Sequence, residues 1–303
     1  MFFLEQFLNG LQLGVMLFLM SAGLTLVFGI MQVVNLAHGS FYMIGAYVAA
    51  TVTLKSGSFL LGLLAALPAA GLSGMVVEVL ILHKLYRRDH LDQVLATFGL
   101  IFFFNELTRI IWGRQPLFMD VPSWLAGSVQ VLPGVQYPVY RLAIILVGVL
   151  VALFLYLLLT RTRLGMQIRA GATNREVIGA LGVNIRLLYT LIFGLGTLLA
   201  GLAGVMAGPL LAVEAGMGES VLILTFVVIV IGGIGSVRGA FIGAILVGLA
   251  DTLARSFLPD LLRLIMDSSA ADRMGSSLAS MSVYILMALI LACKPAGLFP
   301  VEA

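Results

Sequence analysis

Charged residues and cysteines are scarce in this 303-residue chain. Asp, Glu, Lys and Arg together make up 10% of the residues, and hydrophobic residues make up 61%. Soluble globular domains carry roughly 25% charged residues, so this composition excludes an ordinary soluble domain. The mean hydropathy of +1.13 predicts a polytopic helical membrane protein. The one cysteine, Cys293, excludes an intrachain disulfide and argues against a metal cluster.

The chain also lacks a basic stretch at its N-terminus and a strong overall charge. Met-Phe-Phe-Leu-Glu-Gln-Phe has no basic n-region, so we expect no signal cleavage and a first apolar segment that stays as a span. The 17 basic and 14 acidic residues leave a formal charge of +3. Basic residues concentrated in cytoplasmic loops explain this excess better than an anionic partner, and nothing favours nucleic acid binding.

Apolar runs bounded by charges or by Gly and Pro clusters predict the membrane segments. We therefore expect an all-α, polytopic transmembrane bundle of about eight or nine segments, in one transmembrane domain over residues 1–303. The candidate segments are 8–30, 39–54, 59–83, 92–111, 140–159, 187–209, 219–234, 239–257 and 279–294.

Two groups of basic residues predict the orientation of these segments, because cytoplasmic loops are enriched in Lys and Arg. One group is Lys84, Arg87 and Arg88, and the other lies between Arg161 and Arg186. Placing both inside puts loop 112–139 and the N-terminus outside and the C-terminus in the cytoplasm. The charged stretch 255–278 is expected to be an external loop or an interfacial helix.

Residues 29–47 hold polar groups between two long apolar runs. Asn35, His38 and Ser40 occur there without a nearby Lys, Arg, Asp or Glu. Polar side chains and backbone breaks survive in a membrane when they are buried in protein or line a water-filled cavity. Asn35, His38, Gly39, Ser40 and Tyr42 are therefore candidates for a substrate pathway or gate.

A weak internal symmetry relates this stretch to a later one. Residues 10–54 and 187–234 each contain a Gly-rich span, a polar break and a second apolar run, and the second break runs from Pro209 past Glu214 to Glu219. The pattern predicts two inverted half-repeats, 8–111 and 187–294, around a central span at 140–159. Its broken segments would flank a pathway, with Pro209 and Glu214 as further candidates. A chance match between Gly-rich segments is the alternative.

The sequence offers little support for nucleotide binding, metal binding or catalysis. The run Gly232-Gly-Ile-Gly-Ser-Val-Arg-Gly239 lacks the Gly-Lys-Ser/Thr of a P-loop, so we expect a tight turn between two membrane segments. His38 has no Cys, Asp, Glu or second His at ligand spacing, which leaves a proton relay as its other chemical role. Glu106 with Arg109, and Asp251 with Arg255, have the spacing of structural ion pairs.

The segment 164–186 predicts a short amphipathic helix in the cytoplasm. Thr173 and Glu176 fit a Thr-x-x-Glu capping box, and Gly182 is placed to end the helix. The helix could lie on the membrane interface, or it could be a coupling helix that docks into a cytoplasmic partner. The candidate coupling residues are Arg169, Thr173, Glu176, Val177, Ile178, Leu181 and Gly182.

Three motifs in order give the chain a family resemblance. Asn35-Leu-Ala-His-Gly39 with Tyr42-Met-Ile-Gly-Ala-Tyr47, the loop from Arg169 to Asn184, and Gly232 to Ala240 resemble the permease subunits of ABC importers for branched-chain amino acids, of the LivH-like type. The loop departs from the general coupling sequence, because it has Ala170, Gly171 and Ala172 but no Glu-Ala-Ala.

The resemblance implies a transport subunit rather than an enzyme, set in a bacterial inner membrane. Its implied partners are a second homologous permease, two cytoplasmic ABC ATPases that bind the ATP, and an extracytoplasmic substrate-binding protein. The chain itself would need no cofactor. A permease for urea or short amides, a stand-alone channel for a small neutral solute, and a purely structural membrane subunit remain alternatives.

Overall fold

The computed structural model describes residues 2–86, 88–173 and 175–300, apart from the side chains of Leu132, Arg175 and Glu176. All nine predicted apolar segments form helices. They are α1 (Phe2–Met31), α2 (His38–Ser56), α3 (Phe59–Leu80), α4 (His90–Trp112), α5 (Val139–Arg161), α8 (Ile185–Ala207), α9 (Met217–Gly232), α10 (Val237–Leu262) and α11 (Ser268–Cys293).

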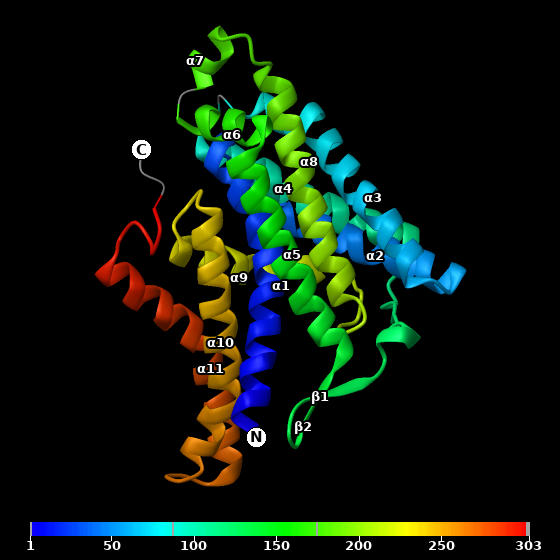
Figure 1. Cartoon of the computed structure of the whole chain (residues 1–303), viewed down its shortest axis with the longest axis vertical. Coiled ribbons are helices and arrows are strands. Elements are labelled where there is room, and N and C mark those ends of the chain that lie inside the picture. Colours follow the sequence, from blue (N-terminus) through cyan, green and yellow to red (C-terminus); the bar gives the residue numbers. More distant parts are fainter. Residues whose placement is uncertain (1, 87, 174, 301–303) are drawn as a thin grey trace.

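Seven helices of the described chain are long and apolar enough to cross a membrane, which makes this a multi-pass membrane protein. The two apolar helices outside this group are α2 and α9, of 19 and 16 residues. These are the helices that follow the two predicted breaks. Figure 1 shows that the long helices α1, α5 and α10 run side by side.

The bundle departs from a purely helical one in the loop between α4 and α5. After a 3₁₀ turn at Ser123–Leu125, β1 (Ser128–Leu132) and β2 (Val135–Pro138) form an antiparallel hairpin. Gly134 supplies the positive φ of +85° at the turn. A second 3₁₀ turn, Leu82–Lys84, follows α3.

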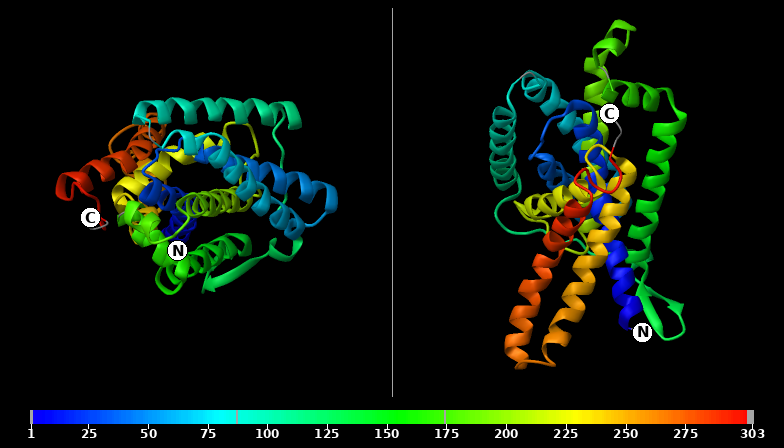
Figure 2. Two further views of the ribbon diagram at one scale, coloured as in Figure 1. Left: turned by 90° about the horizontal axis from the view of Figure 1, so that it is seen from above. Right: turned by 90° about the vertical axis from the view of Figure 1, so that its left-hand side faces the viewer.

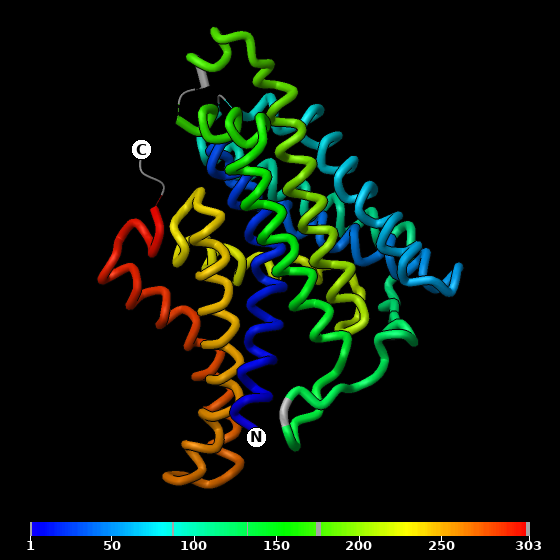
Figure 3. Tube along the Cα trace, in the orientation of Figure 1, coloured from blue at the N-terminus to red at the C-terminus, as the bar shows by residue number. Residues whose placement is uncertain are grey.

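The charged stretch 255–278, for which the sequence predicted an external loop or an interfacial helix, does not form a separate element. Instead α10 and α11 both extend through it, leaving a short turn that is plain in the tube of Figure 3. Arg263 beside this turn pairs with Asp260 at 3.0 Å and with Asp272 at 2.9 Å. The charges therefore lie at the tip of a helical hairpin, where they pair with one another instead of ending the helices.

Helices α1 and α8 form the antiparallel centre of the fold. In each, 78% of the most apolar 18-residue window is buried, against 11% in α11. A Cβ on Gly23 would lie 2.3 Å from the carbonyl oxygen of Gly196, so the two backbones approach as closely as glycine allows. Further along, the Tyr189 hydroxyl donates to the carbonyl of Ile30 at 3.4 Å.

The remaining helices pack around this pair in a reciprocal way. Helix α1 packs on α10, where a Cβ on Gly248 would meet the backbone of Gly14 at 2.3 Å, and α8 packs on α3. The first helix of each predicted half thus lies against the third helix of the other half. The inverted repeat remains a prediction, and this packing has the symmetry that it would require. Viewed from above, α4 lies along one edge of the molecule (Figure 2).

Candidate functional site

The first break, residues 32–37, is partly buried and is braced by a hydrogen bond within the segment. Gln32 has a positive φ of +53°, and the Asn35 side-chain oxygen accepts from the Ala37 amide at 3.0 Å. This Asx turn starts α2, where Ala37 provides no side-chain cap of its own. His38 is fully buried beside the backbone of Met20, and neither ring nitrogen makes a hydrogen bond to a described residue.

The second break, residues 208–216, is more open. Glu214 is exposed and Pro209 is half-buried. Val213 pairs with Leu117 of the loop after α4 through two backbone hydrogen bonds of 2.9 Å, and Gly216 has a φ of +92° at the start of α9. This break is therefore fastened to the α4–α5 connection, and Val213 itself is buried in the core.

The two breaks bring the N-terminal ends of α2 and α9 together. A Cβ on Gly39 would lie 2.5 Å from the carbonyl oxygen of Gly218, and one on Gly218 would lie 2.0 Å from that of Gly39. Since backbone atoms cannot yield as a flexible side chain does, glycine is required on both sides. Helix N-termini carry partial positive charge, so their meeting point is suited to an anionic group.

A small cavity lies beside this crossing. Its volume is about 10 Å³, close to the least that holds one water molecule. In this conformation it is too small for a solute larger than water. Its lining residues are Leu36, Gly39, Ser40, Met43, Ile101, Asn105, Gly216, Gly218 and Glu219.

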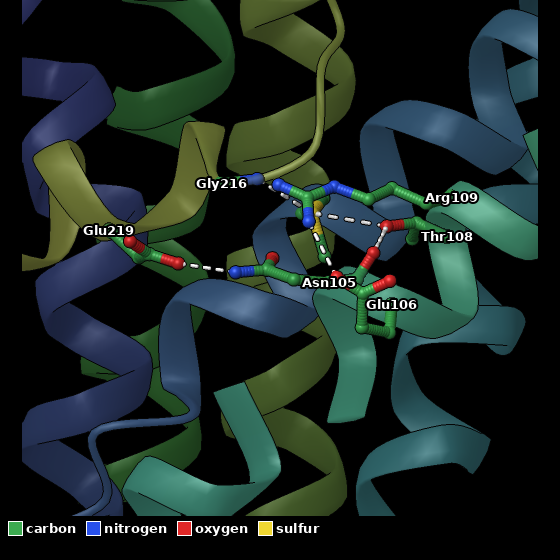
Figure 4. A network of polar contacts seen from close by, with 7 residues as sticks. Asn105, Glu106, Thr108, Arg109, Gly216 and Glu219 are labelled. Atoms are coloured by element: carbon green, nitrogen blue, oxygen red, sulfur yellow. Dashed lines mark hydrogen bonds and ion pairs between the residues drawn. The ribbon is translucent and has the colours of Figure 1, made fainter. Parts of the chain in front are cut away.

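Helix α4 adds a polar face to the cavity, shown close up in Figure 4. The Asn105 side-chain amide donates to the Glu219 carboxylate at 2.5 Å, which links α4 to the first turn of α9. One turn further, Arg109 pairs with Glu106 at 2.5 Å, with both side chains well exposed. Charged side chains on a spanning helix are costly against lipid. This face is therefore suited to contact with protein or water.

Met43 of α2 joins the two halves of the network. Its sulfur accepts from the Gly216 amide at 3.4 Å and from the Thr108 hydroxyl at 3.9 Å. A thioether is a weak acceptor on an adaptable side chain, so these contacts can be exchanged at low cost.

The structure divides the predicted pathway residues into four groups. Gly39 and Ser40 line the cavity, and Asn35 and His38 are enclosed beside it. Tyr42 is buried with its hydroxyl unpartnered among the described residues, and its carbonyl oxygen lies where a Cβ on Gly204 would be 2.0 Å away. Pro209 and Glu214 belong to the second break but do not line the cavity.

Sequence reasoning missed Met43 and Asn105 and did not assign Glu219 a partner. Asn105 could have been found, because Asn105, Thr108 and Arg109 recur at spacings of three and four along an otherwise apolar helix. The link to Glu219 could not, since 114 residues separate the two partners.

The predicted coupling segment forms two helices, α6 (Arg163–Thr173) and α7 (Arg175–Ala180). Gly182 follows α7 with a φ of +87°, as expected of a residue that ends a helix. Val177 and Leu181 are exposed, whereas Ile178 is buried within the chain.

Arg169 of α6 donates to the carbonyl of Leu159 in α5. The Thr173 hydroxyl donates to the Arg169 carbonyl at 3.1 Å, and the Glu176 side chain lies outside the described part, so the capping box stays a prediction.

Comparison with known proteins places this architecture in a family. The permease protein BraD of a high-affinity branched-chain amino acid transport system from Pseudomonas aeruginosa is 29% identical, covering 98% of this chain and 95% of its own. The corresponding LivH protein of Salmonella typhimurium is 29% identical over 85% of this chain and 88% of its own. The ribose import permease RbsC of Escherichia coli is 26% identical over 76% and 71%. Residues 6–293 match the family described as "Branched-chain amino acid transport system / permease component", and the chain belongs to it.

Proposed function

We propose that this chain is the membrane-spanning permease of an ABC importer for branched-chain amino acids. The observation that carries the proposal is the family match over residues 6–293, together with near-complete coverage of the BraD relative. As a permease, the chain is not itself an enzyme, and ATP would be bound and hydrolysed by partner subunits.

The pathway would pass where the N-termini of α2 and α9 meet beside α4. An amino acid carries a carboxylate, which the partial positive charge of two helix N-termini favours, and an apolar side chain, which the Met43 and Ile101 walls accept. The present cavity is nearly closed. Transport would therefore require α4 or the second break to move away from Gly39 and Ser40, so that the pathway opens to one side at a time.

The same interpretation assigns the polar face of α4 to an assembly with a second permease subunit. Asn105, Glu106 and Arg109 lie on a spanning helix and are not enclosed within the described chain. A facing subunit would shield them from lipid and leave a hydrated channel between the two copies.

Energy would enter through α6 and α7. The exposed Val177 and Leu181 offer an apolar surface to a cytoplasmic ATPase, while Ile178 anchors α7 to the rest of the chain. Gly171 of α6 lies close to Ile30, near the end of α1 and the start of the first break. A displacement of α6 would thus be transmitted directly to the first break. In this proposal α6 and α7 lie in the cytoplasm beside an inner membrane, with the N-terminus outside and the C-terminus inside.

Reconstitution of the complete complex in proteoliposomes tests the proposal. The chain, its partner permease, the ATPases and the binding protein should give ATP-dependent uptake of labelled leucine that unlabelled isoleucine and valine compete with. Glu219→Gln, at a residue that lines the cavity, should change uptake severalfold while the ATPases still co-purify, and Asp267→Asn, at an exposed carboxylate of the α10–α11 turn, is the matched control.

Two results would contradict the proposal. Competition by ribose or urea, but not by valine, would assign another cargo. Flux from the chain alone without ATP would instead identify a channel.

A further inference from the structure

A separate cleft opens at the end of α3, away from the α2–α9 crossing. Its volume is about 650 Å³, far larger than the cavity beside Gly39. It is bounded by the end of α3, the turn after it and the start of α8, so it lies where two spanning helices leave the apolar layer. The lining residues are Glu78, Val79, His83, Lys84, Tyr86, Ile185, Arg186, Tyr189 and Thr190.

The carboxylate of Glu78 holds the cleft walls together. One of its oxygens accepts from the Tyr86 hydroxyl at 2.6 Å and the other from the Thr190 hydroxyl at 2.5 Å. Burial and the bond to Glu78 raise the pKa of Tyr86, so the phenol stays a donor. Glu78 is 2% exposed, and it lines the cleft as a carboxylate whose two oxygens already accept hydrogen bonds from the walls.

The rim of the cleft is basic. Lys84, Arg186 and His83 are exposed, and none of the three side chains forms an ion pair within the described residues. The one carboxylate that lines the cleft is Glu78, and both of its oxygens already accept hydrogen bonds. The cleft is therefore complementary to an anion.

Beyond the rim, the surface of α3 is apolar. Val79 lines the cleft, and Val76 and Leu72 follow it along α3 at spacings of three and four residues, all of them exposed. A ligand that meets both surfaces has an anionic head and a hydrocarbon tail. Basic pockets between spanning helices at the membrane surface are known to suit anionic lipid headgroups.

We propose that this cleft binds an anionic phospholipid, with its phosphate between Lys84 and Arg186 and its acyl chains along the Val79 face of α3. The bound lipid would hold α3 against the start of α8, next to the connection between α7 and α8. This inference does not depend on which solute the permease carries.

Native mass spectrometry of the full chain, purified with its partners from detergent supplemented with phosphatidylglycerol and phosphatidylethanolamine, tests the proposal. The wild type should retain phosphatidylglycerol selectively. Lys84→Gln with Arg186→Gln should weaken that retention about 10- to 30-fold, since each basic residue near a lipid headgroup contributes appreciably. Lys84→Arg with Arg186→Lys should keep it, because the charge is unchanged.

A matched control removes two exposed basic residues elsewhere, Lys55→Gln with Arg273→Gln, and should retain phosphatidylglycerol like the wild type. Equal loss in the control would overturn the site in favour of general surface charge. Displacement of the lipid by millimolar inorganic phosphate would overturn it in favour of a simple anion site. Loss of the co-purifying ATPases from Lys84→Gln with Arg186→Gln would show that a protein covers this cleft, which would also overturn the proposal.

Discussion

The two helix breaks differ in how they are held, although both lead into a short helix whose N-terminus reaches the Gly39–Gly218 crossing. Residues 32–37 contain no charged group and bury Val33, Asn35 and Ala37, with an Asx turn at Asn35 as an internal brace. Residues 208–216 are more exposed and are fastened from outside, through Leu117 and the Asn105 link to Glu219. The first break is therefore held within its own segment, whereas the second depends on contacts with the α4–α5 connection and with α4.

This contrast predicts opposite effects of substitution. Changes at the first break and at the shared crossing should lower stability, because they act on a packed interior. Changes around the second break should leave stability nearly intact and alter uptake, because they act on contacts that the transport cycle would remake.

The largest effect is expected at the crossing that both breaks share. Gly39→Val would force a side chain into the carbonyl of Gly218 and should lower the free energy of unfolding by about 3 kcal/mol or more. Thermal unfolding of the purified protein and its yield in the membrane would measure this. Gly99→Ala in α4, where nothing lies within 4 Å, is the control and should be nearly neutral. Equal losses from both would refute the close approach.

The next effect is expected inside the first break. Asn35→Ala removes the acceptor for the buried Ala37 amide and should cost about 1–2 kcal/mol of stability. Asn35→Ser, which can still accept from that amide, should recover part of the loss. If thermal unfolding cannot distinguish Asn35→Ala from the wild type, the Asx turn does not brace this break.

The third prediction concerns the second break. Asn105→Ala should change the free energy of unfolding by less than about 1 kcal/mol, because its bond to Glu219 is partly exposed to solvent. Leucine uptake by the reconstituted complex should nevertheless change severalfold. Glu219→Gln should change uptake in the same direction, and the double variant should add little to either single one, since they break one contact. Additive effects would mean that the two residues act separately.

The smallest effect is expected at the exposed pair beside them. Glu106→Gln should shift the free energy of unfolding of the purified chain by about 0.5 kcal/mol or less, as is usual for solvent-exposed ion pairs. A larger shift that appears only when the partner permease is present would place this face in the subunit interface. A large shift without the partner would contradict the exposed position of the pair.

The sequence predicted much of the fold because a membrane helix can be identified from a local run of apolar residues. All nine apolar runs became helices, since each was bounded by charges or by Gly and Pro. The turn after Gly232 and the helix end at Gly182 were also predictable, because both depend on positive φ at glycine. The continuation of α10 and α11 through 255–278 could not be predicted. Mixed charges are equally compatible with an external loop or an interfacial helix until their pairing partners are known.

The sequence by itself thus determined the class of protein, the number of apolar segments and the positions of the two breaks, since these follow from composition and from the local needs of a backbone in lipid. Only the tertiary structure decided that the breaks meet at Gly39 and Gly218, that Asn105 reaches Glu219, and that Lys84 and Arg186 share a cleft. The physical reason is the same in each case. These contacts join residues more than 100 positions apart, and helix packing alone brings them together.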